Sequence, residues 1–152
     1  MSKALDDLFT GVVTGDFRDL VIGEQIGAGA SREVYAWRPD DSLVVKVELD
    51  KFDWSNIKEW DVWTAIQHTK LAKWFAPCVE IAGNGAVMLQ KRTEPARLSD
   101  LPDKIPAFFT DTKIANWGIL DGQPVCHDYG LHLMLEKGMG QGSRLVKADW
   151  WQ

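Results

Sequence analysis

The stretch IGAGASREVYAW, residues 26–37, decides the fold, because two closely spaced glycines run directly into alternating apolar and polar residues. The segment before it is typical of a strand that runs into glycine, and REVYAWR is typical of the return strand. Gly27 and Gly29 suit a loop whose bare backbone approaches a phosphate, since glycine puts no side chain in the way. They suit a plain tight turn as well, so the rest of the chain must decide.

The next segment, LVVKVEL at residues 43–49, has the clearest strand pattern of the chain. Its alternation places Lys46 on the same face as Val44 and opposite the other apolar side chains. A lysine on such a strand ordinarily extends along the surface to reach solvent. Because the strand otherwise looks buried, a lysine at its centre requires an explanation.

The remaining elements are read from their spacing and turns. Residues 53–75 have apolar side chains at helical spacing, and a short helix is also predicted over residues 2–10. Residues 78–92 and 117–128 each predict a hairpin, around an Asn-Gly turn and an Asp-Gly turn. The chain is therefore expected to be α+β, with three strands, a helix, two strands and a further hairpin.

Composition narrows the class of protein. The chain has 152 residues, and its apolar fraction of 45% and charged fraction of 26% are ordinary for one soluble domain. The net charge of −5, with scattered Lys and Arg, argues against a nucleic-acid partner. No segment has membrane-spanning length, so we expect no membrane partner and a cytoplasmic location. Cys78 and Cys126 lie in no pattern that indicates zinc or a disulfide.

Four short motifs follow one another along the chain, each on a suitable element. The glycine motif G-x-G-x-x-G-x-V has Val34 in place and Arg32 where its third glycine belongs. Lys46 follows in LVVKV, TDTKIANWG at 110–118 matches D-x-x-x-x-N, and DYG at 128–130 follows a hairpin. Their order and spacing resemble the protein kinase superfamily, in which such motifs bind ATP and its metal ions.

The resemblance covers residues 21–131 and implies a protein-kinase-like fold in a single domain, 1–152. It implies an N-lobe over about residues 20–92, with an antiparallel five-stranded sheet and one main helix. Residues 93–152 would form a much reduced C-lobe that carries the catalytic loop and a DFG-like hairpin. The chain is also similar to small kinase-like proteins of bacterial viruses, which implies a phage-encoded protein in the host cytoplasm.

ATP and Mg²⁺ are the ligands that the resemblance implies. The glycine hairpin would cover the phosphates, and apolar side chains with the end of the last sheet strand would enclose the adenine. The residues implied to bind the nucleotide are Gly27, Gly29, Val34, Val44, Lys46, Met88 and Lys91.

Lys46 would hold the α- and β-phosphates of the nucleotide from its strand. Its implied partner on the following helix is Glu59, which shares an inward stripe with Val62 and Ile66. Asp61 is the alternative partner.

The motif TDTKIANWG and the DYG motif carry the remaining implied groups. Asp111 would orient the substrate hydroxyl or accept its proton, and Lys113 would steady the γ-phosphate. Asn116 and Asp128 would hold Mg²⁺. Taken singly, each of these residues also has an ordinary interpretation as a turn or surface residue.

The sequence departs from the family on the substrate side. Phe109-Thr110 stands where His-Arg belongs, and the segment between residue 92 and Asp111 is too short for the two helices of a full C-lobe. No A-P-E motif follows residues 128–130. The nucleotide-facing half is therefore expected to be intact, and most of the substrate-facing half is missing.

Two functions fit this asymmetry. The first is an ATP- and Mg²⁺-dependent phosphotransferase of minimal size, acting on a protein or a small hydroxyl compound. The alternative is a pseudokinase-like effector that binds and inhibits a host partner protein without catalysis, and a non-kinase regulator ranks below both. The shortened side leaves room for a partner protein or a homodimer.

Two further features have alternative interpretations. The Arg32 side chain is expected to lie in solvent, and the alternatives are that it contacts a phosphate or binds a partner protein. Trp150 and Trp151 are adjacent and cannot both face one core, so one ring is expected to cover the domain or meet a partner.

Overall fold

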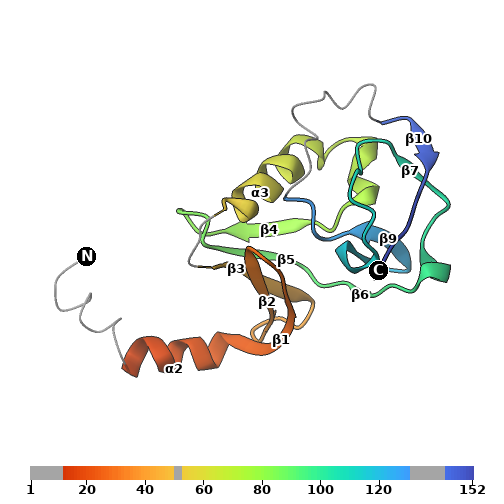
Figure 1. Cartoon of the computed structure of the whole chain (residues 1–152). Coiled ribbons are helices and arrows are strands. Elements are labelled where there is room, and N and C mark those ends of the chain that lie inside the picture. The colour runs from red at the N-terminus through yellow and green to blue at the C-terminus, as the bar shows by residue number, and fades with distance from the viewer. Residues whose placement is uncertain (1–11, 50–52, 131–142) are drawn as a thin grey trace.

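The computed structural model describes residues 12–49, 53–130 and 143–152 (Figure 1). The helix predicted over residues 2–10 lies outside these ranges. Helix α2, Val12–Val21, leads directly into the first strand. None of the described helices is long and apolar enough to cross a membrane.

The main sheet has five strands, all paired antiparallel, in the order β1-β2-β3-β5-β4. This confirms the predicted α+β fold with a five-stranded antiparallel sheet. Asn84 and Gly85 lie in the turn between β4 and β5, where Gly85 has a φ of 77°. The strands are β1 Ile22–Ala28, β2 Arg32–Trp37, β3 Leu43–Glu48, β4 Cys78–Ile81 and β5 Val87–Lys91.

The register of the central strands fixes which side chains are neighbours. Lys46 on β3 lies opposite Val34 on β2 and Met88 on β5. Directly opposed residues in a sheet point to the same face, and so do residues two apart along a strand. Arg32 and Val44 therefore share the face of Lys46 and its two neighbours.

Helix α3, Ser55–Ile66, packs against β3 and β4 and lies above β4 in the view of Figure 1. It is shorter than the predicted helical segment, because the chain turns after Ile66. The Thr69 hydroxyl donates to the Ile66 carbonyl and accepts from the Leu71 amide, and a 3₁₀ helix, η1 Lys70–Trp74, follows. The buried face of α3 is Ser55, Asn56, Glu59, Val62 and Ile66.

Residues 93–130 and 143–152 contain short strands and single 3₁₀ turns, and the structure describes no α-helix there. One sheet has the order β6-β8-β9, and β7 pairs with β10. The predicted hairpin over 117–128 is present, with Asp121 and Gly122 at positive φ in its turn. The elements are β6 Glu94–Pro95, η2 Leu98–Asp100, β7 Lys104–Pro106, η3 Ile114–Asn116, β8 Trp117–Leu120, β9 Gln123–Cys126 and β10 Leu145–Lys147.

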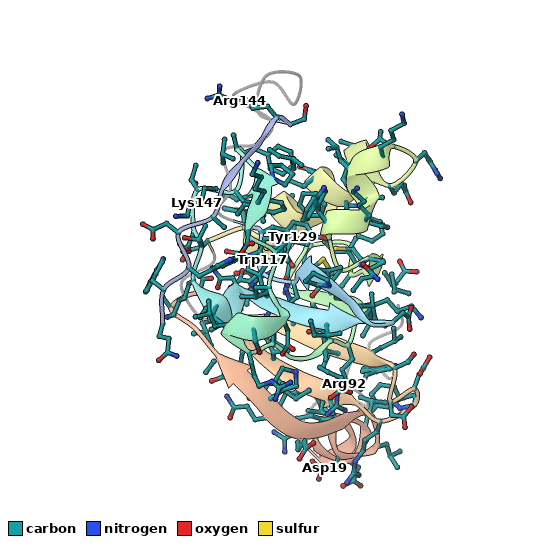
Figure 2. All side chains as sticks on the ribbon, turned by 90° about the vertical axis from the view of Figure 1, so that its right-hand side faces the viewer. Asp19, Arg92, Trp117, Tyr129, Arg144 and Lys147 are labelled. Carbon is teal, nitrogen blue, oxygen red and sulfur yellow. The ribbon has the colours of Figure 1, made fainter. Side chains whose placement is uncertain are left out.

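One apolar core joins both parts of the chain. Side chains from α3 and β5 pack with aromatic rings from the segments around β7 to β9, and Trp117 and Tyr129 lie at its centre (Figure 2). Trp150 packs edge-on against Trp117 with ring centroids 5.1 Å apart, whereas Trp151 is half exposed. The two adjacent tryptophans thus divide the roles, one covering the core and one facing outward.

Candidate functional site

Lys46 has a charged partner inside the protein. Its side chain is buried, and its Nζ donates to Glu59 Oε1 at 2.5 Å and to the carbonyl oxygen of His127. Asp61, the alternative partner, is exposed. The pairing of Lys46 with Glu59 rather than Asp61, predicted from the helical stripe, is therefore present in the structure.

Glu59 is the hub of the site. Its exposed fraction is 0%, and its two carboxylate oxygens accept four hydrogen bonds. A buried carboxylate is tolerable only when such partners replace its lost hydration. The four donors are Lys46 Nζ at 2.5 Å, Arg32 Nη2 at 2.6 Å, Gln90 Nε2 at 2.9 Å and the Tyr129 amide at 3.4 Å.

Arg32 is the main site residue that sequence reasoning missed. Its exposed fraction is 6%, so the expected position in solvent was wrong. Its Nη2 lies 2.6 Å from Glu59 Oε2 and 2.7 Å from Asp128 Oδ1, and its Nη1 donates to Asn56 Oδ1 at 3.1 Å. The available signal was the strand alternation, which puts Arg32 on the face of Val34.

The electrostatics of Arg32 follow from this position. Burial lowers the pKa of the guanidinium, but the negative charges of Glu59 and Asp128 outweigh that effect, and the pKa is raised. Arg32 is therefore a permanent positive charge held between two carboxylates.

The glycines of the hairpin have no role in the fold that would require glycine. Neither Gly27 nor Gly29 has a positive φ. A Cβ at Gly27 would meet nothing within 4 Å, and one at Gly29 only the Arg32 carbonyl oxygen at 3.9 Å. By contrast, a Cβ at Gly85 would lie 2.5 Å from Ile57 Cγ1. Gly27 and Gly29 thus leave the hairpin backbone open to a ligand.

Asp111 and Asn116 lie in contact. Asp111 Oδ2 accepts from Asn116 Nδ2 at 3.0 Å, and Asp111 Oδ1 accepts from the Lys113 amide at 3.2 Å. The Lys113 ammonium lies 5.4 Å from the ring centroid of Trp151. The Asn116 carbonyl oxygen accepts from the Asp128 amide at 3.3 Å, which joins the TDTKIANWG loop to the DYG motif.

Two residues of the DYG motif also have structural roles. Tyr129 is fully buried, and its hydroxyl donates to the Ala76 carbonyl oxygen at 2.8 Å. A Cβ at Gly130 would lie 2.7 Å from the Ser55 carbonyl oxygen, so only glycine allows this approach to α3. Asp128 differs from both, because its side chain is half exposed beside Arg32.

His127, next to Asp128, serves as a neutral hydrogen-bonding residue. Its Nε2–H donates to the Ala115 carbonyl oxygen at 2.8 Å, since a carbonyl can only accept, and its Nδ1 lies 2.7 Å from the Thr93 hydroxyl, which can donate to a neutral ring. Burial, with the nearby charge of Lys46, lowers the pKa of His127. The ring thereby holds the backbone whose carbonyl accepts from Lys46.

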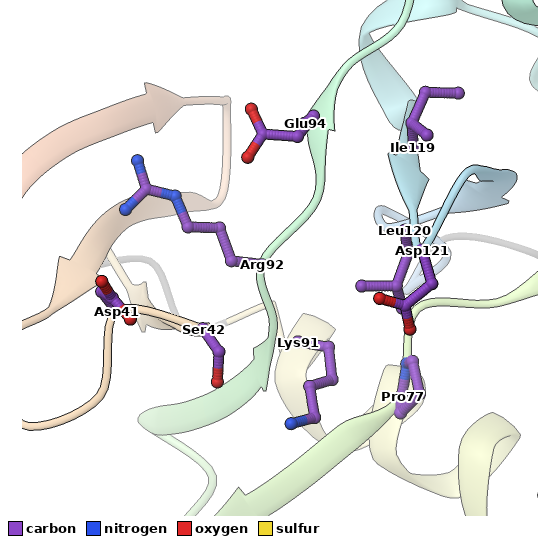
Figure 3. Close-up of a pocket in the computed structure, with 9 residues that line it drawn as sticks. All are labelled: Asp41, Ser42, Pro77, Lys91, Arg92, Glu94, Ile119, Leu120 and Asp121. Carbon is purple, nitrogen blue, oxygen red and sulfur yellow. The ribbon is translucent and has the colours of Figure 1, made fainter.

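The implied adenine-binding residues divide between two places. Val34, Val44 and Met88 lie on the sheet face of Lys46. Lys91, the last residue of β5, instead lines a cavity of about 360 Å³ (Figure 3). The cavity is lined by Asp41, Ser42, Pro77, Lys91, Arg92, Glu94, Ile119, Leu120 and Asp121.

The two residues implied to bind magnesium have suitable ligand atoms, but both side chains already form hydrogen bonds within the protein. Asn116 and Asp128 offer oxygen ligands of the kind Mg²⁺ prefers. However, one Asp128 oxygen is bound by Arg32, and Asn116 is bound to Asp111. Within the described ranges, no three His, Cys, Asp or Glu side chains gather as metal ligands. The arrangement does not fit Mg²⁺ at Asp128 while Arg32 is in place, and the site stays a prediction.

Both cysteines are expected to be unreactive in the folded protein. Burial raises the pKa of the Cys78 thiol to about 12 and also raises that of Cys126, so neither forms the nucleophilic thiolate at neutral pH. Titration with a chromogenic disulfide reagent at pH 8 should label neither thiol in native buffer and both in denaturant. Rapid labelling of native protein would contradict the buried positions.

No family model and no curated protein matches the chain. The likeness to protein kinases therefore rests on the motifs of the sequence.

Proposed function

We propose that the chain is a kinase-like phosphotransferase that binds ATP. The observation that supports this is a continuous path of polar contacts linking the implied phosphate-binding lysine to the implied catalytic aspartate. The path follows Lys46, Glu59, Arg32, Asp128, Asn116 and Asp111.

In this proposal the sheet and the hairpin bind the nucleotide. The phosphates lie under the bare backbone of Gly27 and Gly29, with Lys46 and Arg32 supplying positive charge from the neighbouring strands. Phosphoryl transfer demands mainly alignment and neutralisation of phosphate charge, which these groups can supply.

Asp111 receives the substrate in this proposal. The bond between the γ-phosphorus and its bridging oxygen breaks, a bond from the substrate hydroxyl oxygen to that phosphorus forms, and ADP leaves. The hydroxyl proton passes to the Asp111 carboxylate, which the Lys113 amide and Asn116 Nδ2 hold in orientation. We assign no step to Mg²⁺, because Arg32 holds Asp128.

The proposal is tested by thermal denaturation with ATP. At 100 times its Kd, ATP should raise the stability by about 2.7 kcal/mol, or the Tm by about 5–10 °C. Lys46→Met should abolish this shift, whereas Lys58→Met, a control on the exposed face of α3, should retain it. Asp111→Asn should retain the shift but stop transfer from labelled ATP. Absence of any shift at millimolar ATP would contradict nucleotide binding.

A second candidate is an effector that binds a partner protein without catalysis. It is favoured by the lack of any described α-helix in residues 93–130 and 143–152, where a kinase builds its substrate-binding floor. A host protein captured in equal amounts by the wild type and by Asp111→Asn would support this candidate, provided that ATP gives no thermal shift.

A further inference from the structure

We infer that the Arg32 guanidinium takes the place of a divalent cation between Glu59 and Asp128. As a consequence, the nucleotide binding proposed above requires no Mg²⁺. This consequence rests on the proposed function, whereas the assignment of Arg32 as the resident cation does not.

The position of one nitrogen atom carries the inference. Arg32 Nη2 lies 2.6 Å from Glu59 Oε2 and 2.7 Å from Asp128 Oδ1, so a single cationic atom bridges two carboxylates from different parts of the fold. Asn56 Oδ1 accepts from the same guanidinium at 3.1 Å. Two carboxylate oxygens and an amide oxygen are the ligands that hard divalent cations select. The Arg32 guanidinium thus occupies a position whose surrounding oxygen atoms are of the kind that bind a divalent cation.

The surroundings hold the guanidinium in this site. Asn56 cannot swing away, because its Nδ2 donates to the carbonyl oxygens of Lys46 at 3.1 Å and Gly85 at 3.0 Å. The tight turn before Arg32 is closed by a hydrogen bond from the Gly29 amide to the Arg32 carbonyl oxygen at 2.8 Å. A planar guanidinium is also permanently charged and suited to several acceptors at once.

The charges around Arg32 bear on the same question. Lys46 and Arg32 carry two positive charges and contact the carboxylates of Glu59 and Asp128, and buried Glu48 adds a further negative charge that acts on Arg32. A divalent cation at Asp128 would lie against the guanidinium and would have to displace it, leaving a buried charge without its partner.

Titration with Mn²⁺, without any nucleotide, tests the assignment of Arg32. Wild-type protein should show no Mn²⁺ site that depends on Asp128. Arg32→Ala should bind Mn²⁺ at least tenfold more tightly than the wild type and regain Tm on its addition. Combining it with Asp128→Asn should remove both effects. Arg97→Ala is the control, because it breaks an exposed pair with Asp100 and should gain no site.

A Mn²⁺ site in the wild type that Asp128→Asn removes would overturn the assignment, and this comparison does not require Arg32→Ala to fold. Equal Mn²⁺ affinities of wild type and folded Arg32→Ala would overturn it as well. Arg32→Lys, which keeps a positive charge, should fold and also gain no site, and tight Mn²⁺ binding by this variant would count against the assignment.

The consequence for the nucleotide is tested by the ATP thermal shift in EDTA and in millimolar Mg²⁺. Wild-type protein should give shifts that agree within twofold, and Arg32→Ala should give a shift only with Mg²⁺. A wild-type shift that EDTA abolishes would overturn the metal-independent binding. No wild-type shift in either buffer would instead contradict the proposed function and, with it, this consequence, and the Mn²⁺ titration would still decide the role of Arg32.

Discussion

Replacing Glu59 with glutamine is expected to lower the free energy of unfolding by about 3–5 kcal/mol, which corresponds to a fall in Tm of about 6–20 °C. The substitution keeps the size of the side chain but removes the one carboxylate that both Lys46 and Arg32 contact. Lys46 would then lose the carboxylate that it contacts, and Arg32 would keep half-exposed Asp128 and the amide oxygen of Asn56. Urea denaturation followed by tryptophan fluorescence measures the loss.

Asp61→Asn provides the matched control for Glu59→Gln. It makes the same chemical change two residues away on α3, at a position exposed to solvent, and should alter stability by at most about 0.5 kcal/mol. Similar losses in the two variants would show that the buried network contributes nothing particular to stability, and the hub role of Glu59 would have to be abandoned.

The strands, and the choice between the two candidate partners of Lys46, could be predicted because their signals are local, whereas the family resemblance implied that Lys46 has a partner on the helix. The alternation of residues 43–49 and the Asn-Gly turn after β4 depend on neighbours in sequence. Glu59 was chosen over Asp61 because it lies three residues before Val62, on the same face of the helix, and Val62 faces the core. Each of these inferences used spacings of two, three or four residues.

Arg32 could not be placed by the same kind of reasoning. Its burial depends on Glu59 and Asp128, which are 27 and 96 residues away in sequence. A lone charged residue beside a turn is ordinarily solvated, and the family pattern offers only glycine at this position. Strand alternation places Arg32 on the face of Val34, but that position becomes buried only once Glu59 of α3 and Asp128 of the DYG motif lie against the guanidinium.

The C-terminal part was also beyond local inference. Strand β10 forms because Leu145–Lys147 pairs with Lys104–Pro106, and no spacing pattern in the sequence predicts this contact.

The end of helix α3 could not be predicted from apolar spacing either. The helix predicted over 53–75 ends at Ile66 because the Thr69 side chain forms hydrogen bonds with the backbone on both sides of the turn. Side-chain hydrogen bonds of this kind compete with helix continuation and leave little trace in apolar spacing.

Trp117→Ala is expected to cost about 3–5 kcal/mol, because it removes the largest fully buried side chain of the protein's described part. The indole of Trp117 packs edge-on against Phe109 at 4.9 Å, Trp150 at 5.1 Å and Trp74 at 6.5 Å between ring centroids. These rings come from η1, from the segment after β7 and from the chain end, so Trp117 connects elements on both sides of residue 93.

Trp117→Phe distinguishes the contribution of the ring contacts to stability from the cost of the unsatisfied indole N–H. The indole Nε1 is buried with no hydrogen-bond partner among the described residues, and phenylalanine removes this unsatisfied donor while retaining most of the ring contacts. We therefore expect Trp117→Phe to lose much less stability than Trp117→Ala. Trp151→Ala, at the half-exposed neighbour of Trp150, should cost less than about 1 kcal/mol.

The shape of the transition for Trp117→Ala distinguishes one folding unit from two. Because a single apolar core contains residues of α3, β5 and β8, the variant should unfold in one transition, at a lower denaturant concentration than the wild type. Calorimetry and fluorescence should give the same midpoint. Two separate transitions, with the part before residue 93 unchanged, would show that the sheet with α3 folds independently of the segment that carries Asp111 and Asp128.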